Sequence, residues 1–189
     1  MDNYDFAMQP ELDKSLLMEL SSCRFINLKQ NVILMSKPGV GVNYLANALG
    51  LEALKASHSV IFIHANSIID QLNRSKADGS YYKIMKRISK TNLLILDEVG
   101  FKMFPQNGSD DFFEVIRSRY ETGSLIVTTN RNFEDWGQLF GDNVMASAII
   151  DRIIHHAVLI KLTGDSYRVR NAQINLNNMK SKTEKENEP

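Results

Sequence analysis

The chain has 189 residues, of which 43% are hydrophobic and 23% charged, with 10 Gly and 4 Pro. These values fit one globular domain and exclude collagen-like and wholly disordered chains. Cys23 is the single cysteine, which excludes an intrachain disulfide and a Cys-based zinc cluster, so we expect a cytoplasmic protein. No apolar run approaches the roughly 20 residues of a membrane span. Because Lys and Arg balance Asp and Glu at 22 each, nucleic-acid binding would require a local basic patch.

Short apolar runs alternate with stretches of helical spacing after an N-terminal segment and helix in residues 1–30. The runs predict five strands, at 31–35, 60–63, 93–96, 125–128 and 158–160. Helices are expected at 44–56, 67–72, 81–89, 111–120 and 144–154. The runs are apolar at nearly every position, so the sheet should be mainly parallel and covered on both faces. The predicted fold is three-layer α/β over residues 31–170, followed by a disordered polar tail at 171–189.

A loop with two glycines follows the first expected strand and leads into the helix that starts at Tyr44. Its residues are Ser36-Lys37-Pro38-Gly39-Val40-Gly41-Val42-Asn43. A phosphate-binding loop at this place has the pattern G-x-x-x-x-G-K-[ST], whose Lys holds the terminal phosphates and whose hydroxyl binds Mg²⁺. Gly39 and Gly41 keep the frame of the pattern, whereas Ser36, Val42 and Asn43 replace its first Gly, its Lys and its Ser/Thr. The loop therefore predicts a phosphate site that has lost its usual cation.

Polar groups follow two later strands and one late helix. Asp97 and Glu98 directly follow the third expected strand. In P-loop ATPases, acids at this place hold Mg²⁺ and polarise the attacking water, and the alternative is that they simply begin a solvated loop. Asn130 ends the fourth strand and suits either a γ-phosphate sensor or a turn. Arg152 lies on an otherwise apolar helix, where it either pairs with Asp151 or reaches the γ-phosphate of a neighbouring subunit.

With these features in this order, the sequence resembles the IstB-like ATP-binding proteins. These are AAA+ ATPases that assist insertion-sequence transposases, and they are related to the DnaC helicase loader. The resemblance extends from about residue 6 to 170. It rests on several blocks, among them Gln9-Pro10-x-Leu12-Asp13, Tyr44-Leu45-Ala46, Arg119-Tyr120-Glu121-x-Gly123-Ser124, Thr129-Asn130-Arg131, Trp136-Gly137, Ile150-Asp151-Arg152 and Ser166-Tyr167-Arg168. It implies an AAA+ P-loop fold with a five-stranded parallel sheet, and we expect no separate lid domain.

The resemblance also implies roles for individual residues and partners. Asp97 and Asn43 would face the metal, Glu98 would be the catalytic acid and Asn130 the sensor. Arg152 would act as an arginine finger across a subunit boundary, and the loop from Ser36 to Tyr44 would bind ATP with Mg²⁺. Family members assemble as homo-oligomers on duplex DNA and deliver the transposase to its target.

Two departures from the family pattern change these expectations. Val42 and Asn43 remove an ammonium and a hydroxyl from the phosphate loop, so we predict weak ATP binding and slow or absent hydrolysis. Lys37 is a hypothetical partial substitute. The resemblance implies an N-terminal helical domain ahead of the Gln9-Pro10 segment, and because the sequence begins near that segment we expect a truncated gene, a decayed element or an alternative start. A DnaC-like helicase loader and an inactive remnant of the family therefore remain alternatives.

A local excess of basic residues lies in the helix expected at 81–89. The residues that share one side of it are Lys83, Lys86, Arg87 and Lys90. They form either a DNA-binding patch or an ordinary solvated face. His155 and His156 point about 100° apart on a helix, which disfavours a metal pair, and the aromatic group around Trp136 is expected to be core.

Overall fold

The computed structural model describes residues 12–105 and 108–163, so the expected tail at 171–189 lies outside the described part. One sheet contains five strands in the order β2-β3-β4-β1-β5, and every neighbouring pair is parallel. The strands are β1 (Asn31–Ser36), β2 (Val60–His64), β3 (Leu93–Val99), β4 (Ser124–Thr129) and β5 (Ala157–Leu162). All five expected strands are confirmed, and β3 extends through Asp97 and Glu98 instead of ending before them.

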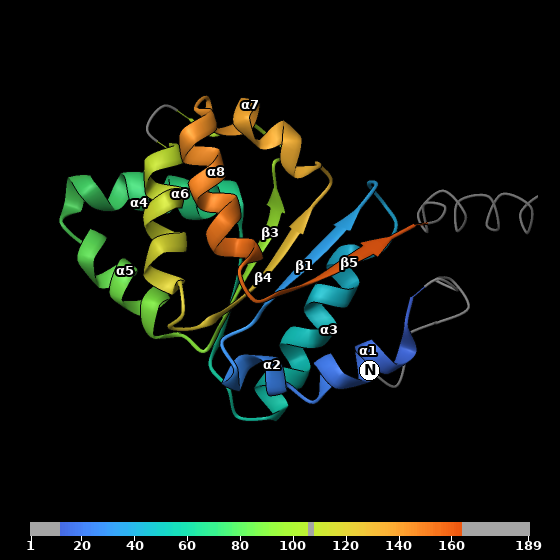
Figure 1. Ribbon diagram of the computed structural model, residues 1–189. Helices are drawn as coiled ribbons and strands as arrows, with labels where there is room; N and C mark the ends of the chain where they lie inside the picture. The colour runs from blue at the N-terminus through green and yellow to red at the C-terminus, as the bar shows by residue number, and fades with distance from the viewer. Residues whose placement is uncertain (1–11, 106–107, 164–189) are drawn as a thin grey trace, which may run out of the picture.

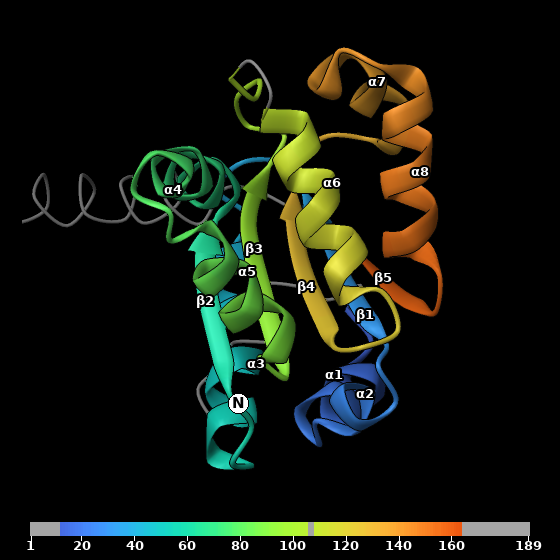
Figure 2. The same cartoon turned by 90° about the vertical axis from the view of Figure 1, so that its left-hand side faces the viewer.

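Helices cover both faces of the sheet (Figures 1 and 2). One face carries α1 (Lys14–Ser21), α2 (Arg24–Asn27) and α3 (Val42–Lys55). The other carries α4 (Ala65–Asp78), α5 (Tyr81–Lys90), α6 (Gly108–Arg119), α7 (Trp136–Phe140) and α8 (Asn143–Ile154). Within the described residues, all helices belong to these two layers.

Two local features differ from the expectation. The N-terminal helix is divided into α1 and α2, because Cys23 between them adopts a left-handed conformation with φ 59°. A short 3₁₀ turn, η2 (Phe133–Asp135), and α7 also form where no helix was expected. Trp136 of α7 is fully buried against Phe133 and Phe140, so the aromatic group is part of the core, as predicted.

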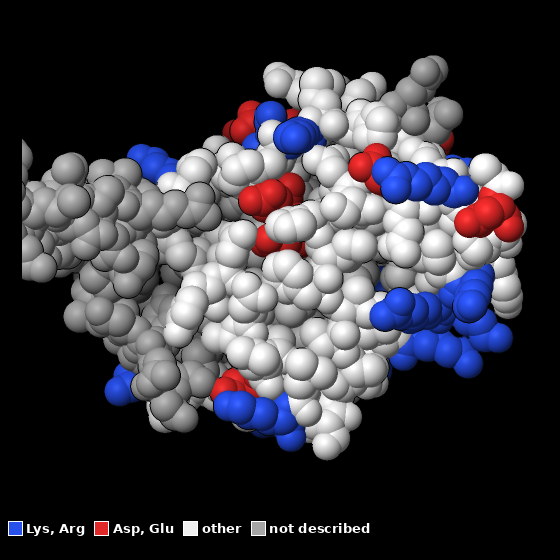
Figure 3. All heavy atoms as spheres, turned by 180° about the vertical axis from the view of Figure 1, so that it is seen from behind, with Lys and Arg blue, Asp and Glu red and all other residues white. Residues whose placement is uncertain are grey.

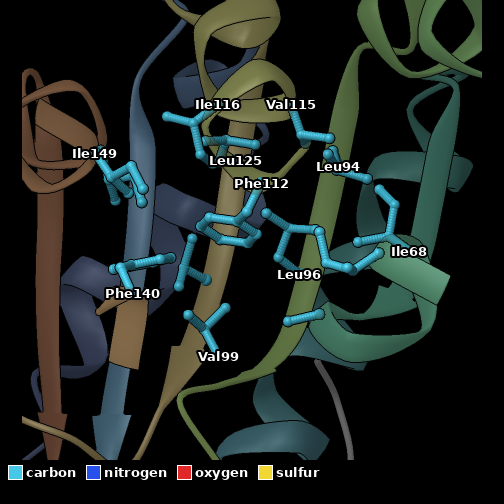
Figure 4. Close-up of a cluster of buried hydrophobic side chains, with 14 of the residues drawn as sticks. Ile68, Leu94, Leu96, Val99, Phe112, Val115, Ile116, Leu125, Phe140 and Ile149 are labelled. Carbon is cyan, nitrogen blue, oxygen red and sulfur yellow. The ribbon is translucent and has the colours of Figure 1, made fainter. Parts of the chain in front are cut away.

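Alternate residues of each central strand enter opposite halves of the core. Val32 and Leu34 of β1 pack on the side of α3, whereas Ile33 packs on the side of α4, α6 and α8. Figure 4 shows the second half, where Phe112 of α6 lies over Leu96 and Leu125. These buried strands explain the nearly continuous apolar runs in the sequence. None of the helices in the described ranges has the length and apolar character needed to cross a membrane.

Candidate nucleotide-binding site

The loop between β1 and α3 has the backbone form that the two glycines permit. Gly39 and Gly41 adopt φ angles of 88° and 102°, which residues with a Cβ rarely adopt. Gly41 caps α3, whose first residue is Val42. The positive end of a 14-residue helix therefore adjoins the loop, and such helix ends attract phosphate.

The side chains of the loop differ from those of an intact phosphate loop. Val42 presents an isopropyl group at the place of the usual ammonium, and it packs partly against the core. Lys37 is exposed at the start of the loop. Ser36 is buried and its hydroxyl donates to the Lys37 carbonyl at 2.9 Å. The remaining members, Pro38 and Tyr44, are exposed, whereas Val40 is buried.

Asn43 of α3 contacts Asp97 of β3 through a side-chain hydrogen bond. The Asn43 amide Nδ2 donates to Asp97 Oδ2 at 2.9 Å. The other carboxylate oxygen, Oδ1, accepts a hydrogen bond of 2.6 Å from the Thr128 hydroxyl. Asp97 is only 1% exposed, so these two donors and the nearby His64 compensate for much of its lost hydration. In this arrangement the Asn43 amide donates to Asp97, the acid expected to hold a metal, whereas the hydroxyl of an intact P-loop ligates the metal itself.

A β-bulge sets the direction of the two acids. Leu96 pairs with Val127 and Val99 pairs with Thr129, so Asp97 and Glu98 together oppose Thr128 alone. Glu98 adopts a left-handed φ of 60°, and its N–H donates to the Thr128 hydroxyl at 2.8 Å. As a result Asp97 is buried while the Glu98 side chain remains 42% exposed. Thr128 was not singled out in the sequence, although it directly precedes the polar end of its strand.

His64 is a second residue that sequence reasoning missed. It ends β2 in register with Asp97 on the neighbouring strand. Its Nδ1 lies 3.3 Å from Asp97 Oδ2 and 3.6 Å from Glu98 Oε2. The rule that selected polar residues at strand ends would have found His64 if it had been applied to β2.

Asn130 directly follows β4, beside the phosphate loop, because Thr129 pairs with Met35 of β1. Its side chain is exposed. The next residue, Arg131, joins the ends of β3 and β4: its Nε donates to the Gly100 carbonyl at 2.5 Å, and its backbone N–H donates to Thr129 Oγ1 at 3.2 Å. Asn43, Asp97, Glu98 and Asn130 thus lie along the carboxyl edge of the sheet, and a hydrogen bond connects Asn43 with Asp97.

Arg152 lies at the opposite edge. Its backbone carbonyl is 3.5 Å from Nδ2 of Asn31, the first residue of β1. Its guanidinium donates to the Ala148 carbonyl at 2.6 Å and lies 5.1 Å from the centre of the Phe113 ring. A strand of six residues is about 16 Å long, so Arg152 is separated from the phosphate loop of its own chain.

The expected basic patch is exposed along α5, with Lys83, Lys86, Arg87 and Lys90 all facing solvent. Figure 3 shows Lys and Arg side chains gathered over the side of the molecule where α4 and α5 lie. Lys76 of α4 differs, because it forms an ion pair of 2.7 Å with the buried Asp111. A hollow of about 380 Å³ between α4 and α5 lies near the patch and away from the phosphate loop, and Arg74 and Ser80 are among its lining residues.

Solved structures share this fold. A DnaC helicase loader is 17% identical with a TM-score of 0.64, and the match covers 79% of this chain and 89% of that one. DnaA from Aquifex aeolicus with bound AMPPCP is 21% identical with a TM-score of 0.65, covering 87% and 51%. At these identities the comparison shows the P-loop NTPase fold of the AAA+ type.

Sequence comparison identifies the family. A protein named for ATP binding in insertion sequence IS21 of Pseudomonas aeruginosa is 38% identical over 170 residues, which are 90% of this chain and 64% of that protein. Its counterpart in IS5376 of Geobacillus stearothermophilus is 36% identical over 174 residues, 92% and 69% respectively. The chain thus spans about two thirds of the length of these relatives. The family model of the IstB-like ATP-binding proteins matches residues 1–174. The chain therefore belongs to the IstB-like ATP-binding proteins of insertion sequences.

Proposed function

We propose that this chain is a nucleotide-responsive accessory of DNA transposition, with weak ATP binding and slow or absent hydrolysis. The family and the insertion-sequence relatives support the transposition role and a transposase as partner. Their identities are well above that to the helicase loader, which favours this proposal over a role in helicase loading.

The contact between Asn43 and Asp97 is the observation that carries the proposal for nucleotide binding. It brings the phosphate loop to within hydrogen-bond distance of the expected metal-binding acid, 54 residues later in the chain. The positions of these groups therefore suit a bound ATP with Mg²⁺. The loop backbone and the start of α3 would hold the phosphates, and Asp97 would hold the metal. Mg²⁺ would supply charge that the loop lacks at Val42.

Restoring the loop tests the proposal. A missing hydrogen bond to a charged group is worth about 1.5–3 kcal/mol, so ATP affinity should rise roughly 10- to 100-fold when Val42→Lys and Asn43→Thr are combined. Affinity is measured by calorimetric titration with ATP and Mg²⁺, and turnover by phosphate release. Leu51→Lys, at an exposed site of the same helix, adds the same charge away from the loop and should change neither value.

The outcomes distinguish the alternatives. Renewed turnover in the double variant would indicate a complete scaffold with a disabled loop. No binding in either form would show a family remnant without a nucleotide site. Tight binding and normal turnover by the unaltered chain would contradict the proposed weakening.

We infer that the exposed face of α5 contacts duplex DNA through its phosphates. Each phosphate contact adds about 0.9 to the slope of log affinity against log salt, so removing three cations should lower that slope by about 2–3. The variant combines alanine at Lys83, Lys86 and Arg87. A control removes the same charge at the exposed Lys29, Lys102 and Lys161. Equal slopes for the two triple variants would contradict the inference.

The position of Arg152 supports assembly of several copies. It lies at the edge away from the phosphate loop of its own chain, so a role at a γ-phosphate requires a neighbouring subunit. In the restored double variant the loop again carries its own cation, so Arg152→Ala should abolish turnover and leave ATP affinity nearly unchanged. Unchanged turnover would refute the finger role.

A further inference from the structure

Three metal-ligating side chains converge at the ends of β2 and β3. They are His64, Asp97 and Glu98, and one ligand atom from each lies within 4.8 Å of the other two. His64 and Glu98 are about half exposed, whereas Asp97 is buried, so the group forms a small site that is open to solvent on one side.

The separations of the ligand atoms fit a small divalent ion. Zn²⁺ binds imidazole nitrogen and carboxylate oxygen at about 2.0–2.2 Å, which places neighbouring ligands of a tetrahedral ion about 3.3–3.6 Å apart. The distances from His64 Nδ1 to Asp97 Oδ2 and Glu98 Oε2 are 3.3 and 3.6 Å. The two separations that involve His64 therefore match those of ligands around one metal ion, and all three ligand atoms lie within 4.8 Å of one another.

The surroundings already orient the buried ligand. Thr128 donates to Oδ1 of Asp97, and Asn43 donates to Oδ2, the oxygen that faces His64. A carboxylate oxygen has two lone pairs, so Oδ2 retains one for a metal while Asn43 uses the other. Hydrogen bonds of this kind fix ligands and strengthen metal binding.

We propose that His64, Asp97 and Glu98 bind a divalent transition metal ion without nucleotide, with Zn²⁺ preferred over Mg²⁺. Mg²⁺ takes oxygen ligands and retains its waters, whereas an imidazole ligand favours Zn²⁺ and its neighbours in the first transition row. The inference extends the proposed function, because Asp97 and Glu98 are the acids assigned there to Mg²⁺ and catalysis. A bound transition ion at this place would keep a positive charge beside a phosphate loop that lacks Lys.

Calorimetric titration of the unliganded chain with Zn²⁺ and, separately, with Mg²⁺ tests the proposal. We expect one Zn²⁺ per chain, and His64→Gln should weaken its affinity roughly 100-fold or more by removing the nitrogen ligand. Mg²⁺ affinity should be the same in both proteins. Titration with Co²⁺ gives a second readout, since loss of the imidazole changes the visible absorption of the ion.

Matched controls separate this site from other imidazoles. The chain has three further histidines, His58, His155 and His156. His58→Gln and the double variant His155→Gln, His156→Gln should retain Zn²⁺ affinity. If only the double variant loses the ion, or if no Zn²⁺ binds, the three groups form an ion-paired cluster and the proposal is wrong.

The measurement is independent of nucleotide binding. Zn²⁺ binding with no detectable ATP binding would refute the proposed nucleotide role and leave the metal site intact. ATP binding in a chain that binds no Zn²⁺ would refute the metal site alone. Because His64 is exposed at the end of an edge strand, its replacement should not prevent folding, and circular dichroism checks this point.

Discussion

Arg119, the last residue of α6, is a buried cation held by backbone carbonyls. We predict that replacing it lowers the stability of the fold. The side chain is 1% exposed, and burial lowers the pKa of its guanidinium to about 10, so it remains protonated at neutral pH. Among the described residues, the hydrogen-bond acceptors of its guanidinium are all backbone carbonyls. Its two terminal nitrogens donate to the carbonyls of Ile88, Ser89, Thr91, Asn92 and Ser124.

These bonds connect the end of α5, the turn before β3 and the start of β4. Replacing Arg119 with Met keeps much of the volume and removes the guanidinium donor from the buried carbonyls of Thr91 and Ser124. The Ile88 carbonyl also loses this donor but keeps the Thr91 N–H at 3.4 Å. Each unsatisfied group costs about 1–3 kcal/mol. The variant also avoids burying a guanidinium, which costs several kcal/mol, so we expect a net loss of about 3 kcal/mol in the free energy of unfolding.

Urea denaturation followed by circular dichroism measures this loss as a lower midpoint at an unchanged slope. Arg117→Met is the matched control, because Arg117 lies on the same helix but is exposed and forms an ion pair with Glu114. Exposed pairs contribute little in water, so its midpoint should stay near that of the unaltered chain. Equal midpoints for the two variants would refute the reasoning that the carbonyl cluster requires Arg119.

Two further variants test the same packing and the site. Gly123→Ala would place a Cβ 2.2 Å from Arg119 Nη2, so it should lower the free energy of unfolding by roughly 1–3 kcal/mol, and by less in the Arg119→Met background. Thr128→Val removes the hydroxyl shared by Asp97 and the Glu98 N–H, which should cost about 1–3 kcal/mol by the same urea assay, whereas Thr122→Val at an exposed turn should cost much less.

The fold followed from the sequence because the three central strands, β1, β3 and β4, are buried along nearly their whole length. Runs such as residues 93–96 are apolar at every position, a pattern that few exposed segments share. Boundaries were less predictable where tertiary contacts decide them. The division between α1 and α2 depends on the left-handed conformation of Cys23. Helix α7 forms because Trp136 and Phe140 enter the core. Neither feature has a local sequence signal.

The sequence predicted the site residues that one strand alone marks, and it missed those that become neighbours only through strand pairing. Asp97 and Asn130 stand out because each follows an apolar run. His64 and Thr128 become relevant only through the register that places them beside Asp97, on strands 33 and 31 residues away in the chain. The bulge that turns Glu98 toward solvent also depends on this pairing.

The separation between Arg152 and the acids affects how the site would bind nucleotide. Its acids and the amide of Asn43 lie at one edge of the sheet, and Arg152 lies about one strand length away at the other. Within the described residues, Arg152 therefore lies too far from the loop of its own chain to reach a phosphate bound there. If copies stack so that Arg152 of one faces the loop of the next, that arginine would supply a positive charge that Val42 does not. Nucleotide affinity should then rise with protein concentration in the unaltered chain, and an affinity independent of concentration would exclude this compensation.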